Sequence, residues 1–239
     1  MWGVGSGSIK RTPMLLVNEY FRSLQGEGVY AGHPMSFLRL FGCNLACKWC
    51  DTPYSRVGTG SKYELSAQEV VNKVKNLPTR KGDWLCITGG EPLFQSVELQ
   101  KVINLLALDG INLTIETNGS YPIPSWAKKV TSWNADIKCP SSGEGGKSLE
   151  EWLYLEPIHQ VKFVVGDRTD ISFVTKTLER NPKRTSTILI SPCLFVDSSG
   201  NLGKRSKEWI PTVASFCIEM NLIFSLQIHK VIWGAKRGV

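Results

Sequence analysis

Along one short stretch the chain reads Phe41-Gly42-Cys43-Asn44-Leu45-Ala46-Cys47-Lys48-Trp49-Cys50, with its cysteines in the spacing C-x3-C-x2-C. No fourth cysteine or histidine lies close by in the sequence to complete a set of four. Structural zinc sites have four protein ligands, whereas catalytic metal sites keep a position open. Iron–sulfur clusters are held by thiolates at short spacings of this kind. Three thiolates on a four-iron cluster would leave one iron free to bind another molecule, and the spacing favours such an open site.

Two other interpretations of the cysteines stay open at this point. The stretch could be a zinc knuckle, or an electron-transfer cluster whose last ligand comes from elsewhere in the chain. The candidates for that ligand are Cys86, Cys139, Cys193 and Cys217. Cys86 and Cys217 lie among apolar neighbours, which is typical of small core residues.

Around this stretch, short β-branched and apolar runs alternate with helical patterns. The predicted strands are residues 14–20, 35–40, 84–88, 112–116, 130–137, 160–165, 187–191 and 222–226. The predicted helices are residues 66–76, where Ser66 and Glu69 form a capping-box pattern, 96–108, 148–154, 170–180 and 207–220. Strand–helix alternation predicts a parallel sheet with right-handed crossovers.

Residues that could take part in catalysis or ligand binding follow the ends of five predicted strands. They are 43–50 with the cysteines, 88–92 (Thr-Gly-Gly-Glu-Pro), 117–119 (Thr-Asn-Gly), 136–140 (Asp-Ile-Lys-Cys-Pro) and 191–193 (Ser-Pro-Cys). Barrels of parallel strands form their sites at these carboxyl ends, and about six strand–helix units fit the chain. We therefore predict an α/β fold, a partial (β/α)6 TIM-like barrel with one open side. Residues 14–239 are expected to form a single domain after a flexible leader, 1–13. Residues 143–146 are expected to form a flexible loop, and the loop 141–147 is expected not to touch the motifs.

Composition narrows the function classes. The chain has 239 residues, of which 42% are hydrophobic and 21% charged, as in ordinary globular proteins. Its net charge is +7, but the basic residues are scattered and do not predict nucleic-acid binding. No apolar run approaches the roughly 18 residues of a membrane-spanning helix. Without a signal sequence, we expect a cytoplasmic protein whose seven cysteines are reduced or bind metal.

Two groups of motifs carry a family resemblance. The cysteine stretch followed by Gly89-Gly90-Glu91-Pro92 resembles the radical S-adenosylmethionine (SAM) superfamily. Gln25-Gly26-Glu27-Gly28, Phe37-Leu38-Arg39, Cys50-Asp51-Thr52 and the terminal residues 227–239 resemble the 7-carboxy-7-deazaguanine synthase family within it. The resemblance extends over residues 14–239.

The resemblance implies a reaction and its cofactors. The reaction is ring contraction of 6-carboxy-5,6,7,8-tetrahydropterin to 7-carboxy-7-deazaguanine, with loss of ammonia, in queuosine and 7-deazapurine biosynthesis. A [4Fe–4S] cluster would cleave SAM to a 5′-deoxyadenosyl radical, and SAM would be regenerated at the end of the cycle. The resemblance also implies Mg²⁺, a homodimer and an electron donor such as flavodoxin or ferredoxin.

Site residues follow by position. The resemblance implies Cys43, Cys47 and Cys50 as cluster ligands and Thr52 as a magnesium ligand. Around SAM it implies Trp49, Asp51, Gly89, Gly90, Glu91, Asp136, Lys138, Ser191, Pro192, Cys193 and Leu194. Around the pterin it implies Leu24, Gln25, Gly26, Arg39, Thr88, His229 and, through its terminal carboxylate, Val239. Glu27 would bind the pterin or transfer a proton during ammonia loss.

Chemistry agrees with several of these roles, although plainer interpretations exist. The Gln25 amide can contact a pterin edge, Arg39 can hold a carboxylate at two points, and Mg²⁺ takes oxygen ligands. Without the resemblance, Thr52 would be a turn residue before Pro53, Arg39 an outward strand residue, Asp136 and Lys138 solvated loop residues, and His229 a packed or surface histidine.

Two rival functions remain. An activating enzyme that places a glycyl radical on a partner protein shares C-x3-C-x2-C and this chain length. It would lack the Gln-Gly-Glu-Gly and Cys-Asp-Thr stretches. A non-catalytic iron–sulfur or zinc protein is the second rival, and it would not cleave SAM on reduction.

Overall fold

The strands of the protein form one mixed sheet. The structure, a computed structural model, describes residues 14–56, 62–77, 82–197 and 201–239, and the predicted leader lies outside them. The described strands are β1 (Leu15–Leu24), β2 (Pro34–Leu40), β3 (Tyr63–Leu65), β4 (Trp84–Gly89), β5 (Asn112–Thr117), β6 (Ser132–Asp136), β7 (Gln160–Val165), β8 (Thr187–Pro192) and β9 (Ile223–Phe224). They are ordered β3-β1-β2-β4-β5-β6-β7-β8-β9.

From β2 to β9 every described neighbour pair is parallel and, apart from the insertion of β3, follows chain order. This is the arrangement expected of a partial barrel. At the other edge the prediction of a parallel sheet was wrong, because β1 is antiparallel to both β2 and β3. Residues 25–33 join β1 to β2, and a parallel crossover would need a dozen residues or more.

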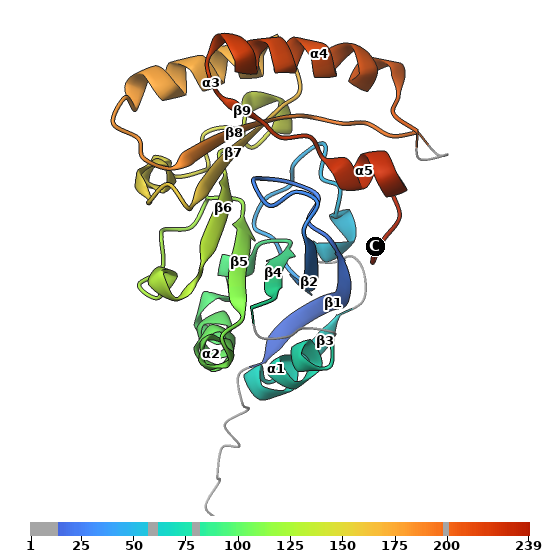
Figure 1. Ribbon diagram of the computed structural model, residues 1–239, viewed down its shortest axis with the longest axis vertical. Coiled ribbons are helices and arrows are strands. Elements are labelled where there is room, and N and C mark those ends of the chain that lie inside the picture. The colour runs from blue at the N-terminus through green and yellow to red at the C-terminus, as the bar shows by residue number, and fades with distance from the viewer. Residues whose placement is uncertain (1–13, 57–61, 78–81, 198–200) are drawn as a thin grey trace, which may run out of the picture.

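Helices accompany the sheet unevenly. They are α1 (Ala67–Lys75), α2 (Ser96–Leu106), α3 (Arg168–Arg180), α4 (Lys204–Glu219) and α5 (Ile228–Trp233). In Figure 1, α3 and α4 lie together at one end of the molecule and α1 and α2 at the other. The capping box that the sequence predicts for α1 is present, with Glu69 N–H donating to Ser66 Oγ at 3.3 Å.

The crossovers on either side of β6 contain 3-10 turns where helices are usual. The predicted helix at 148–154 is a 3-10 helix, Glu150–Tyr154, without a side-chain cap at its start. Three buried tryptophans pack here: the ring centroids of Trp126 and Trp133 lie 5.7 Å apart, and those of Trp133 and Trp152 lie 5.2 Å apart. Each large aromatic side chain buries much apolar area, so a few of them on short segments can cover β6 where no α-helix does.

The strand period sends alternate side chains to opposite faces of the sheet. On β7, Val161, Phe163 and Val165 belong to the main hydrophobic core, whereas Lys162 and Val164 line a cavity on the inner face. The end of the chain closes that side. The amide of Ile228, the first residue of α5, donates to Gly26 O at 2.9 Å, and Figure 1 shows α5 and the C-terminus beside β1.

Candidate active site

A cavity of about 520 Å³ lies at the carboxyl ends of the parallel strands. It brings together most of the residues that the sequence selects: Leu24, Gln25, Gly26, Glu27, Arg39, Cys43, Cys47, Trp49, Cys50, Asp51, Thr52, Thr88, Gly89, Gly90, Asp136, Lys138, Cys193, Leu194, His229 and Val239. Among the predicted site residues, Glu91, Ser191 and Pro192 do not line it and are buried. The volume is typical of a small-molecule site.

The three motif cysteines are half-buried free thiols in the wall of this cavity. Cys43 Sγ accepts contacts from Leu45 N at 3.4 Å and from Asn118 Nδ2 at 3.8 Å. Such N–H···S contacts tune iron–sulfur clusters. Burial raises the pKa of Cys47, and the nearby charge of Lys138 opposes this effect.

The spread of the sulfurs argues against a single zinc ion. Tetrahedral zinc with sulfur ligands at 2.3 Å requires sulfurs about 3.8 Å apart. Within the described ranges, the one set of three or more cysteine, histidine or acidic ligand atoms that all lie within 4.8 Å of one another consists of Glu27, Asp51 and His229. At least one pair of the three motif sulfurs therefore lies more than 4.8 Å apart, which is wider than one tetrahedral zinc ion needs.

The loop 141–147 supports the cysteine stretch directly, contrary to expectation. Glu144 Oε1 accepts from Ala46 N at 2.9 Å, and Ser142 O accepts from Lys48 N at 2.9 Å. Trp49 Nε1 donates to Ser141 Oγ at 3.2 Å. No local sequence pattern indicates these contacts, because they join segments almost a hundred positions apart.

The same cavity is lined by a continuous chain of polar side chains, which we call the ionic chain. Its members, in spatial order, are Lys138, Asp136, Lys162, Glu27, Gln227, Lys230 and Asp51. Apart from the neutral Gln227, cationic and anionic groups alternate along it. The solvated-loop interpretation of Asp136 and Lys138 was wrong, because their side chains are only 16% and 10% exposed and form an ion pair.

Glu27 lies at the centre of the ionic chain. Its carboxylate pairs with Lys162, and Gln227 Nε2 donates to its Oε1 at 2.6 Å. Burial alone would raise the pKa of Glu27, but the charges of Lys162 and His229 overcome this effect and lower the pKa to about 2. Glu27 is therefore a carboxylate throughout the physiological range.

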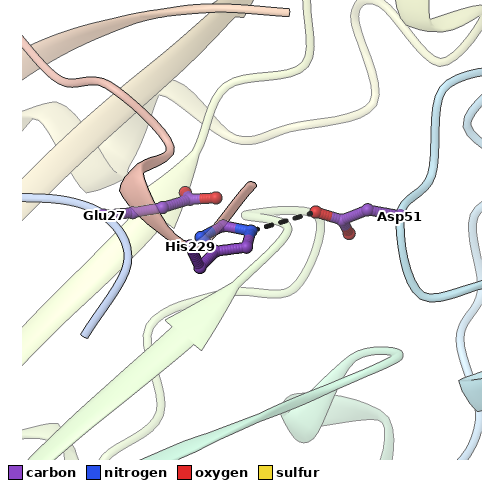
Figure 2. A group of neighbouring side chains, drawn as sticks. All are labelled: Glu27, Asp51 and His229. Atoms are coloured by element: carbon purple, nitrogen blue, oxygen red, sulfur yellow. Dashed lines mark ion pairs between the residues drawn. The ribbon is translucent and has the colours of Figure 1, made fainter. Parts of the chain in front are cut away.

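Figure 2 shows the ring of His229 between the carboxylates of Glu27 and Asp51. His229 Nε2 lies 3.9 Å from Asp51 Oδ2, and Lys230 Nζ lies 3.4 Å from the same oxygen. This trio has the spacing of a metal site, but Lys162 and Lys230 already neutralise its two carboxylates. A divalent cation there would face two ammonium groups, so we interpret the trio as part of a hydrogen-bonding surface.

Comparisons with known proteins agree with this geometry. Residues 39–136 match the Radical SAM superfamily. A 7-carboxy-7-deazaguanine synthase from Koribacter versatilis is 36% identical, with 91% of this chain and 96% of that protein covered. One from Methanospirillum hungatei is also 36% identical, with 95% and 91% covered. The chain belongs to the 7-carboxy-7-deazaguanine synthase family.

Solved structures agree on the fold of this synthase family. The crystal structure of QueE from Escherichia coli superposes with a TM-score of 0.66 at 23% identity, covering 89% of this chain and 93% of that one. A radical SAM methyltransferase from Sphaerobacter thermophilus gives a TM-score of 0.54 at 12% identity, covering 90% and 77%. Both support the partial barrel that the sequence predicts.

As a radical SAM synthase of this family, the protein uses a [4Fe–4S] cluster, SAM and Mg²⁺. Cys43, Cys47 and Cys50 form what we call the cysteine wall, and this wall fits the cluster because its three thiols face one cavity and Cys43 Sγ accepts N–H···S contacts. Thr52 fits a magnesium ligand in one respect: it lines the cavity, and its hydroxyl lies 3.9 Å from Cys50 Sγ and makes no capping bond to the 3-10 turn that follows. Of the four other cysteines, Cys193 lines the cavity, and burial raises its pKa to about 11.

Three residues assigned to the pterin are already engaged with protein groups. Gln25 Nε2 donates to Glu116 Oε1 at 3.1 Å, and Thr88 Oγ1 donates to Glu116 Oε2 at 2.7 Å. Arg39 Nε pairs with Glu19 Oε1 at 2.7 Å. These contacts make Gln25 and Thr88 supports for Glu116, and contact between any of the three and substrate stays a prediction.

The motif glycines are needed for close packing within the protein. A Cβ on Gly90 would lie 2.2 Å from Gly42 O, and one on Gly89 would lie 2.2 Å from Leu40 O. A Cβ on Gly26 would lie 2.0 Å from His229 Nδ1. The groups nearest to a Cβ at position 89 or 90 belong to the backbone of β2 and the cysteine stretch, and contact of these two glycines with SAM stays a prediction.

Glu91 supports the cysteine wall from the protein interior, without lining the cavity. Its carboxylate is fully buried and accepts hydrogen bonds from Leu93 N at 2.8 Å, Thr117 Oγ1 at 2.8 Å and Asn118 N at 2.6 Å. Because the Asn118 side chain in turn contacts Cys43 Sγ, Glu91 supports the Cys43 thiol through Asn118.

Sequence reasoning missed Lys162, Glu116 and Gln227 as cavity residues. A signal existed for the first two. Lys162 is a lone charged residue inside the apolar run 160–165, and Glu116 has the same character at the end of 112–117. A charge that alternates with buried apolar residues on a strand of a barrel points inward. Gln227 had no such signal, since it precedes a short helix that the sequence did not reveal.

Proposed function

We propose that the chain converts 6-carboxy-5,6,7,8-tetrahydropterin to 7-carboxy-7-deazaguanine with release of ammonia, in queuosine and 7-deazapurine biosynthesis. One observation carries the proposal: the thiol motif and a buried, charge-compensated ionic chain line the same cavity of about 520 Å³. The thiols suit the cluster, and the alternating charges suit a polar heterocycle with both donors and acceptors.

Different residues of the cavity have different roles in the proposed reaction. When bound, the cluster and SAM supply the organic radical that takes a hydrogen atom from the substrate. Cys43, Cys47 and Cys50 hold the cluster. Asp136 and Lys138 carry the charges that complement the amino and carboxylate groups of SAM, and both line the cavity. Pairs between ionised groups of this kind give the stronger hydrogen bonds.

The two roles considered for Glu27 are not equally supported. A group with a pKa of about 2 is ionised and is a weak base at neutral pH. We therefore assign Glu27 to binding, as an acceptor for the N–H groups of the pterin ring. We assign Arg39 to the substrate carboxylate, because it lines the cavity and its contact with Glu19 is made through Nε.

The test is anaerobic turnover of the reconstituted protein with SAM, dithionite, Mg²⁺ and the carboxytetrahydropterin. We expect 7-carboxy-7-deazaguanine and ammonia in equal amounts, with SAM not consumed in proportion to product. Omitting Mg²⁺ should lower the rate. Cluster-loaded protein that cleaves SAM but yields no deazaguanine would overturn the proposal and favour the activating-enzyme alternative.

Three finer predictions accompany the activity. We propose that a small protein such as flavodoxin or ferredoxin donates the electron, that the protein is a homodimer, and that it acts in the cytoplasm. Reduced flavodoxin or ferredoxin should replace dithionite, and light scattering should give twice the chain mass. In the part of the chain that is described, no helix is long and apolar enough to cross a bilayer.

A further inference from the structure

A buried lysine that has no place in the chemistry above stands in the middle of the ionic chain. Lys162 is on the inner face of β7, and its side chain is only 9% exposed. Burying an ammonium group is costly unless anionic groups surround it. Lys162 has two such partners, Glu27 from the loop after β1 and Asp136 from the end of β6, the second at 3.3 Å.

The two partners of Lys162 serve different ligands in the proposed reaction. Glu27 faces the pterin, whereas Asp136 and its neighbour Lys138 face SAM. Asp136 keeps Lys138 as a partner even without Lys162, but Glu27 has no other lysine at ion-pair distance among the described residues. The carboxylate that depends on Lys162 most is therefore the one on the substrate side.

We propose that Lys162 is a positioning residue that holds the Glu27 carboxylate in its substrate-binding orientation and fixes it relative to the Asp136–Lys138 pair. The inference rests on the proposed function, because it assigns Glu27 to the pterin. It goes further because the affinity for the pterin then depends on Lys162, a residue that has no assigned contact with substrate or SAM. Substrate and SAM are then held by one connected set of charges.

Other groups around Glu27 leave this role to Lys162. Gln227 donates one neutral hydrogen bond from the residue before α5, and His229 faces Glu27 from the same helix. Asp51, directly after the cysteine stretch, repels the carboxylate. Lys162 is the strongest favourable influence on the charge of Glu27.

The test is steady-state kinetics of the cluster-loaded protein with the carboxytetrahydropterin, comparing wild type, Lys162→Met, Lys162→Arg, Glu27→Gln and the double variant. Removing one partner of a buried ion pair leaves the other charge uncompensated, which is strongly destabilising. We expect Lys162→Met to raise the KM for the pterin by roughly 10- to 100-fold and to change kcat by less. Lys162→Arg should recover most of the loss. Lys183→Met, at an exposed position, is the matched control and should behave as wild type.

Coupling separates positioning from general damage. If Lys162 acts through Glu27, adding Lys162→Met to Glu27→Gln should raise KM by no more than about threefold. The double variant also removes one unpaired carboxylate, so it should fold even if Lys162→Met does not. A full 10- to 100-fold further increase in that background, or an unchanged KM in Lys162→Met, would overturn the inference. Absence of wild-type turnover would instead count against the proposed function.

Discussion

The two walls of the cavity are built in opposite ways. The cysteine wall comes from one continuous stretch, and its thiols are half-exposed. The ionic chain joins residues up to about two hundred positions apart, and its charges are largely buried and neutralised by one another. The first wall is completed by a group from outside the protein, whereas the second is complete in itself. The cofactor can therefore be predicted from a local sequence motif, whereas substrate recognition depends on the whole fold.

Removing one thiol should have the largest effect, because nothing in the fold replaces it. In Cys47→Ser, a hydroxyl stands where a soft thiolate is needed to bind iron. We expect loss of the cluster and of all detectable SAM cleavage, measured as iron and acid-labile sulfide per chain after anaerobic reconstitution.

Cys217→Ser is the matched control for this prediction. Cys217 is a buried thiol of α4 that belongs to the hydrophobic core and does not line the cavity. Its replacement should leave iron content as in wild type. Full iron occupancy in Cys47→Ser would remove the distinction between the two walls.

Glu91→Gln tests whether the cysteine wall also depends on buried polar support. The carboxylate accepts Leu93 N on one oxygen and Asn118 N on the other, so either orientation of an amide leaves one backbone N–H without its acceptor. A buried unsatisfied donor costs about 1–3 kcal/mol, and urea denaturation should show a loss of that size.

For Glu91→Gln the control is Glu219→Gln, an exposed position at the end of α4. We expect this change to stay within about 0.5 kcal/mol of wild type. Equal stability of the two variants would mean that the bonds to Glu91 contribute nothing net.

Gly26→Ala tests the contact that brings the end of the chain to the ionic chain. The added Cβ would lie 2.0 Å from His229 Nδ1 and 2.9 Å from His229 Cβ, so rotation of the ring cannot relieve the clash. Overpacking costs about 1–3 kcal/mol, and we expect the KM for the pterin to rise about tenfold or more while iron content stays constant.

The control for Gly26→Ala is Gly203→Ala, where the nearest atom to a new Cβ is Phe195 O at an ordinary 3.5 Å. An unchanged KM in Gly26→Ala would show that α5 moves freely relative to the ionic chain.

The same contrast explains which features of the fold and the site could be predicted from the sequence. The cysteine spacing is local, and the parallel strands from β2 to β9, apart from the inserted β3, repeat a period that can be read directly, so both were predicted. The short strand β3 and the helix α5 are too brief to carry a period, and both were missed. The link between Glu27 and Gln227 depends on where α5 docks, so no pattern near either residue could reveal it.

The smallest effect is expected from pH, and it tests whether the ionic chain is complete in itself. An acid whose pKa is lowered to about 2 carries the same charge from pH 6 to pH 9. The ratio of kcat/KM between wild type and Glu27→Gln should therefore stay constant within about twofold over that range, because the charge of Glu27 does not change there and groups remote from Glu27 affect both proteins alike. Suppose instead that the burial of Glu27 prevailed over the charge of Lys162, so that its pKa lay near neutrality. Wild type would then come to resemble Glu27→Gln as the pH fell, and the ratio would shrink toward one at pH 6. Such a shrinking ratio would mean that the ionic chain, like the cysteine wall, is completed only when its ligand binds.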